Sequence, residues 1–242
     1  MGYSFFLYIL LAILPSYIWL LFFLREDKNP EPNLRVLKIF LLGILSTIPV
    51  FLIERYSLNI LEKIALFPPL TLFLRFFVAI ALVEELFKYL VVRIGVLRKP
   101  DFDEPIDAPL YMMVAALGFA AAENILVFSS QEFEIFYGPY LLAMARFLGA
   151  TLLHALCAGI LGYFLAISFW KIKRRKLFFG LGLTSATLLH GFYNFFIMKT
   201  EGLVQIFGPV ILLAGTIFII FLAFKKLKKL KSVCLFELPS VT

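Results

Sequence analysis

Cysteine and histidine are scarce in this sequence, which contains two of each. Cys157 lies inside an apolar run and Cys234 near the C-terminal end, a placement that indicates neither a disulfide framework nor a cysteine-ligated metal site. The HExxH motif of helical zinc proteases is also absent. We find no internal repeat and no low-complexity tract, so repeat architectures are excluded.

Long polar segments are missing as well. Only 16% of the residues are charged, 62% are hydrophobic, and the mean hydropathy is +0.96. A soluble domain is about half apolar, and a membrane span needs about 20 apolar residues. Seven such runs lie near residues 3–24, 36–53, 69–97, 109–129, 139–170, 177–198 and 203–224. We predict an all-α polytopic membrane protein, a bundle of about seven transmembrane helices that forms one integral membrane domain over residues 1–242.

The basic residues are distributed unevenly between the loops. Seventeen of the 23 Lys and Arg residues fall at 25–38, 93–99, 171–176 and 225–231, whereas the alternate loops hold three. This positive-inside bias predicts a multi-pass protein of the cell (cytoplasmic) membrane with its N-terminus outside and its C-terminus in the cytoplasm. The first run has no charged residue and is too long for a signal-peptide core, so we expect a retained span. Basic clusters at such positions favour contact with the lipid bilayer over nucleic acid.

Against this apolar background, a few polar residues lie inside the predicted spans. Charge at the centre of a span costs about 2.5–3.5 kcal/mol on insertion scales, so such residues usually mark function. Both histidines are among them, and four of the set lie 14 to 17 residues from a cytoplasmic boundary, near mid-membrane. The set comprises Glu84, Glu85, Lys88, Glu123, Asn124, Arg146, His154, His190 and Asn194.

Helical spacing indicates how these side chains share faces. Glu84 and Lys88 are four residues apart, which favours an ion pair, and His190 and Asn194 are also four apart. Glu84 and Glu85 point about 100° apart, so we expect them to have different roles. Lys88 and Arg146 are more simply explained as ion-pair partners of buried glutamates than as catalysts.

Two chemistries fit this set of residues. A buried glutamate can act as a general base, with imidazole and carboxamide donating hydrogen bonds to an oxyanion. Alternatively, both histidines with one or two glutamates can hold a zinc ion with an open position for water.

Four segments, taken in order, resemble one family. The segments "EELFK" (84–88), "DAPLYMMVAALGFAAAEN" (107–124), "HALCAGILGY" (154–163) and "HGFYN" (190–194) are similar to successive motifs of the PrsW family of intramembrane proteases. The loop "DKNPEPN" (27–33) resembles the first cytoplasmic loop of that family. The distantly similar CAAX-prenyl endopeptidase and Abi proteins carry Arg after their Glu-Glu pair and His after Phe-x-x-x. Here Lys88 and Glu123 occupy those places, which favours PrsW.

The resemblance implies a membrane peptidase that cleaves a membrane-anchored protein, an anti-sigma factor in the name-giving members. It implies regulated intramembrane proteolysis. Because His and Glu dominate the buried set, we expect a metalloprotease centre with zinc as the candidate cofactor. The catalytic residues that the resemblance predicts are Glu84, Glu85, Glu123, His154, His190 and Asn194. The predicted metal ligands among them are Glu85, Glu123, His154 and His190.

Two other classes of function stay open at this point. A proton-coupled transporter or channel also uses buried Glu and His relays, although it is expected to show repeated halves. A non-catalytic membrane partner, such as a scaffold, is the third alternative.

Overall fold

The computed structural model of the chain describes residues 2–26, 29–64, 66–97, 99, 102–129 and 131–229. These residues form helices and no strand, which confirms the predicted all-α class. Cys234 and the end of the last basic cluster lie outside the described residues. The helices are α1 (Gly2–Leu24), α2 (Asn33–Lys63), α3 (Pro68–Phe73), η1 (Leu74–Leu82), α4 (Val83–Gly95), α5 (Asp107–Ser129), α6 (Gln131–Arg146), η2 (Phe147–Thr151), α7 (Leu152–Trp170), η3 (Ile172–Arg174), α8 (Arg175–Lys199) and α9 (Gly202–Leu227).

These helices correspond to the seven predicted runs, because two runs are divided by π-helical turns. α3, η1 and α4 follow one another without a break, and α6, η2 and α7 do the same. Among the described residues, five stretches are long and apolar enough to cross a membrane, in α1, α2, α5, the continuous α6–η2–α7 helix and α9. The continuous α3–η1–α4 helix and α8 complete the seven, and they carry Glu84, Glu85, Lys88, His190 and Asn194.

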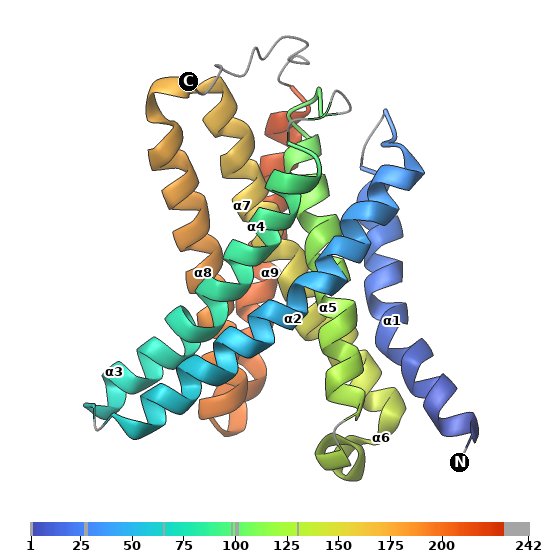
Figure 1. Cartoon of the computed structure of the whole chain (residues 1–242), viewed down its shortest axis with the longest axis vertical. Helices are drawn as coiled ribbons and strands as arrows, with labels where there is room; N and C mark the ends of the chain where they lie inside the picture. Colours follow the sequence, from blue (N-terminus) through green and yellow to red (C-terminus); the bar gives the residue numbers. More distant parts are fainter. Residues whose placement is uncertain are drawn as a thin grey trace.

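The centre of the bundle is formed by α5 and α7. Within their apolar stretches, 72% of residues are buried in α5 and 83% in the stretch that contains α7, against 22–33% in α1, α2 and α9. Figure 1 shows α2 crossing in front of α5, with α8 on one side and α1 on the other. The outer helices instead expose many large apolar side chains, as expected of surfaces that face lipid.

The two ends of the described chain lie on opposite sides of the bundle. α1 begins at the lower end in Figure 1, and α9 ends at the upper end. Glu26, just after α1, pairs with Lys228, just after α9, at 2.6 Å. An odd number of crossings follows from this arrangement. Which side faces the cytoplasm stays a prediction.

Two glycines allow α2 and α5 to pack with their backbones in close approach. A Cβ atom on Gly118 would lie 2.0 Å from the carbonyl oxygen of Phe40, and one on Gly43 would lie 2.2 Å from that of Ala115. Small residues permit such contacts between membrane helices, whose association depends on packing. The close crossing brings α2 against α5, which carries Glu123 and Asn124.

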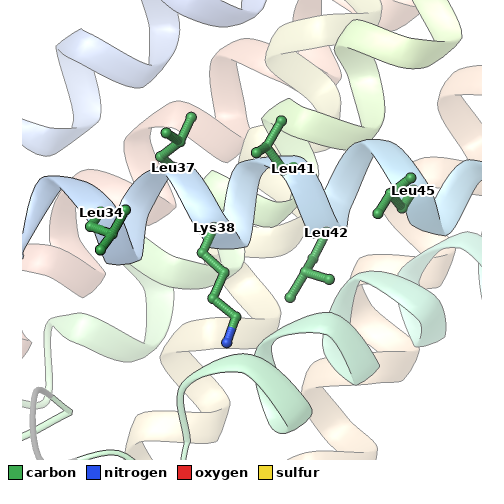
Figure 2. Close-up of a pocket in the computed structure, with 6 residues that line it drawn as sticks. All are labelled: Leu34, Leu37, Lys38, Leu41, Leu42 and Leu45. Atoms are coloured by element: carbon green, nitrogen blue, oxygen red, sulfur yellow. The ribbon is translucent and has the colours of Figure 1, made fainter.

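Away from this cluster, α2 also borders an apolar hollow on the membrane-facing surface. Figure 2 shows its lining, which consists of leucines and a single Lys38 from this one helix. The apolar lining is typical of a surface that contacts lipid chains, and the Lys38 side chain extends away from the α2 ribbon with its amine at the far end. We therefore assign this hollow no chemical role.

Candidate active site

π-helical turns directly precede both the acidic motif and the first histidine. η1 ends at Leu82, two residues before Glu84, and η2 ends at Thr151, three residues before His154. A π-helical turn widens the helix and rotates the residues that follow it, and such turns occur frequently at functional sites. Here they set the direction in which the polar side chains of α4 and α7 enter the bundle.

Lys88 occupies the centre of the buried cluster. Its Nζ donates to Glu85 Oε1 at 2.7 Å, to Glu84 Oε2 at 3.2 Å and to His154 Nδ1 at 2.8 Å. The side chain is completely buried and lies over the ring of Phe119, 4.7 Å from its centroid. An ammonium has three hydrogens, so all three are used. The expected ion pair with Glu84 therefore forms, within a larger network.

Each histidine is held by a glutamate at one ring nitrogen. His154 Nε2 lies 2.7 Å from Glu123 Oε2, and His190 Nδ1 lies 2.9 Å from Glu85 Oε1. A carboxylate accepts at both places, so each of these nitrogens carries the hydrogen. With the hydrogens assigned from these contacts, the other nitrogen of each ring, Nδ1 of His154 and Nε2 of His190, keeps its lone pair. Both histidines are 2% exposed, which excludes water as the alternative partner for most of the ring.

The remaining ring nitrogens converge on Glu84. Its Oε2 lies 3.6 Å from His154 Nδ1 and 3.9 Å from His190 Nε2. The rings themselves meet edge to face at 5.1 Å between centroids. One carboxylate oxygen from α4 and two nitrogens from α7 and α8 thus lie around a common point.

Arg146, at the end of α6, contacts Glu123 and thereby helps to fix the carboxylate that holds His154. Its Nη2 lies 2.9 Å from Glu123 Oε2, and its Nε donates to Asn124 Oδ1. Asn124 in turn donates to the carbonyl of Ala12 and to Thr151 Oγ1. The chain of contacts links α1, α5, α6 and η2 to His154. Arg146 pairs with a glutamate, as the sequence analysis expected.

One acid near the centre was not among the predicted residues. Glu54 of α2 lies within electrostatic range of Glu84, Lys88 and Glu123, and its Oε1 is buried without a hydrogen-bond partner among the described residues. It also lines a pocket of about 550 Å³ with Phe51, Arg55 and three further residues of α2. The predicted apolar run ends at residue 53, just before Glu54. In the structure α2 continues to Lys63, so Glu54 lies inside the helix and not in a loop.

Five of the six predicted catalytic residues therefore contact one another directly or through Lys88. The exception is Asn194, which lies one turn beyond His190 on α8 and is half-buried. In the part of the chain that the structure describes, no hydrogen bond joins Asn194 to the cluster. The predicted ligands Glu85 and Glu123 contact the hydrogen-bearing nitrogens, whereas Glu84 faces the lone pairs.

Comparison with known proteins places this cluster in a family. Residues 31–224 match the family described as "PrsW family intramembrane metalloprotease". The chain belongs to the PrsW family. The matched region contains every residue of the cluster, and Asn194 as well. PrsW proteins are peptidases, which decides against the transporter and scaffold alternatives.

Several PrsW proteases are similar to the chain over most of its length. Protease PrsW of Geobacillus kaustophilus (strain HTA426) is 32% identical over 180 residues, 74% of each chain. That of Oceanobacillus iheyensis (strain DSM 14371) is 31% identical over 203 residues, 84% of this chain and 86% of the relative. Protease PrsW of Bacillus subtilis (strain 168) is 29% identical over 213 residues, 88% and 89% of the two chains. No solved structure matches the chain.

The metal in the PrsW family description can be tested against the donor atoms present. Two groups among the described residues have ligand atoms within 4.8 Å of one another: Glu84 with His154 and His190, and Glu85 with Cys157 and His190. Tetrahedral zinc with bonds of about 2.0–2.2 Å separates its ligand atoms by about 3.3–3.6 Å. The distances from Glu84 to the two rings are within a few tenths of an ångström of this range. The first group therefore fits a divalent cation.

Proposed function

We propose that this PrsW-family protein cleaves a membrane-anchored protein of the anti-sigma factor type, in the cell membrane, with zinc held by Glu84, His154 and His190. The observation that carries the metal proposal is the convergence of two lone-pair nitrogens on Glu84 Oε2. Two histidines and one glutamate are an established ligand set of catalytic zinc. The substrate class and the cytoplasmic membrane rest on the family resemblance and on the distribution of basic residues.

The remaining residues of the cluster have supporting roles in this proposal. Glu85 and Glu123 fix the two rings through the hydrogen-bearing nitrogens, as outer carboxylates do in histidine–zinc sites. Bound at the three ligands, zinc would supply Lewis acidity and activate water for attack on a peptide carbonyl. Glu54, whose Oε1 has no hydrogen-bond partner among the described residues, would serve as the general base that accepts a proton at this centre. Asn194 donates its amide hydrogen to the oxyanion.

The first test is cleavage by the purified full-length chain in detergent, with single-span anti-sigma factors as candidate substrates. We expect Glu84→Gln and His190→Ala to lower the rate by about 10³-fold or more, because the ligands act as one unit. Glu62→Gln is the matched control, since this glutamate is exposed on α2. Chelation should abolish cleavage by the unsubstituted protein, and zinc should restore it. Cleavage by His190→Ala at the unsubstituted rate would overturn the proposed centre, and indifference to chelation would overturn the metal.

A further inference from the structure

Lys88 places its ammonium against the same atoms that would bind a metal. Two of its three acceptors, Glu84 Oε2 and His154 Nδ1, belong to the Glu84–His154–His190 group, and the third, Glu85 Oε1, belongs to the second group. Nothing in the sequence motif distinguishes this arrangement from an ordinary ion pair between helix neighbours. The contact with His154, 66 residues further along the chain, does.

The contact between Lys88 and His154 excludes simultaneous metal binding at that nitrogen. Nε2 of His154 carries the hydrogen that faces Glu123, so Nδ1 has one lone pair in the plane of the ring. That lone pair accepts the Lys88 hydrogen at 2.8 Å. A nitrogen with one lone pair can accept a hydrogen bond or bind a cation, but it cannot do both.

Burial makes this competition consequential. Lys88 is completely buried, its three hydrogens have three acceptors, and Phe119 covers it. The ammonium is therefore a fixed positive charge, unscreened by water, about 3 Å from two of the three metal ligands. Its charge holds Glu84, Glu85 and His154 together when no metal is bound, and it opposes a divalent cation at the same place.

We infer that Lys88 is a built-in cation that occupies the Glu84–His154 ligand pair in alternation with the metal, and that it thereby sets the metal affinity of the centre. The inference rests on the proposed metal centre and adds to it a positioning residue that is not itself a ligand. Two consequences follow. Removal of the charge strengthens metal binding, and it makes the stability of the protein depend on metal.

The first consequence is tested by titrating the full-length chain with Co²⁺ or Zn²⁺ in detergent. We expect Lys88→Met to lower the dissociation constant by about tenfold or more, because a neutral side chain of similar length removes the opposing charge. Lys38→Met is the matched control, since Lys38 is exposed on α2 and should leave the constant unchanged. His154→Ala should abolish the absorption spectrum of bound Co²⁺, both alone and in combination with Lys88→Met. An unchanged or larger dissociation constant in folded Lys88→Met would overturn the inference.

The second consequence keeps the test decisive if Lys88→Met folds poorly without metal. Without Lys88, the buried carboxylates lose their counter-charge, so the midpoint of thermal unfolding should fall and zinc should restore it. The same zinc concentration should raise the midpoint of the unsubstituted protein by less. Failure of zinc to restore the unfolding midpoint of Lys88→Met would contradict the inference. If neither protein binds metal while the unsubstituted chain still cleaves its substrate, the metal centre and this inference fail, but the peptidase activity stands.

Discussion

Glu123 holds the outer nitrogen of His154 at 2.7 Å, and this contact determines which nitrogen of the ring faces the centre. The same carboxylate is paired with Arg146, so the orientation of His154 is supported from a third helix. These contacts fix the ring of His154 so that the lone pair of Nδ1 points toward the centre, as outer carboxylates do for histidine ligands of metals. The roles of Glu123 and Arg146 can therefore be tested separately from those of the proposed ligands.

Replacement of Glu123 by Gln should weaken metal binding and cleavage by about 10-fold to 100-fold, because the ring loses the acceptor that fixes its orientation. Arg146→Gln should act in the same direction through Glu123. The measurements are the zinc dissociation constant and kcat/KM. The double substitution should cost little more than Glu123→Gln alone, since the two residues act in series. Fully additive losses would show that Arg146 acts on some other part of the protein.

Replacement of Cys157 should distinguish the two possible donor groups. Cys157 is buried beside Glu85 and His190 and belongs only to the second group. If Glu84, His154 and His190 are the ligands, Cys157→Ala should bind Co²⁺ with an affinity within about twofold of the unsubstituted protein, with no thiolate band in either spectrum. A thiolate charge-transfer band that disappears with Cys157→Ala would favour the second group.

Replacement of Glu54 should lower activity without lowering stability. Glu54→Gln keeps the size of the side chain but cannot accept a proton, so we expect kcat to fall about 10²-fold with the unfolding midpoint unchanged or raised. Glu62, which lines the same pocket, provides the matched control in Glu62→Gln. Equal effects of the two substitutions would indicate a general property of the pocket and no specific role for Glu54.

Replacement of Gly118 should test the close crossing of α2 and α5. In Gly118→Ala the new methyl group would meet the carbonyl oxygen of Phe40, a backbone atom that can move only with its helix. We expect a loss of about 1–3 kcal/mol or more in stability, as in other overpacked cores. Gly180→Ala is the control, because a Cβ there has nothing within 4 Å and alanine favours the helix. The measurement is thermal unfolding of both variants in the same detergent.

Much of the fold was predictable because the bilayer imposes a length and a polarity on each helix. The runs of about 20 apolar residues predict the helices, and the positions of the two histidines and the Glu84–Glu85 pair indicate a buried centre, since lipid makes such residues costly. The boundary of α2 was predicted less well. Glu54 and Arg55 resemble the start of a loop, but α2 continues to Lys63, so Glu54 lies inside the helix.

The sequence by itself determined the helical membrane class, the family and all the polar residues of the centre but Glu54, because each depends on local composition and on motif order. Tertiary structure alone decided which nitrogen of each histidine faces inward, that Glu84 and not Glu123 lies between the rings, and that Lys88 reaches His154. These relationships join residues of different helices. The rotations of those helices depend on the π-helical turns and on the glycine contacts between backbones, which no pattern along one helix specifies.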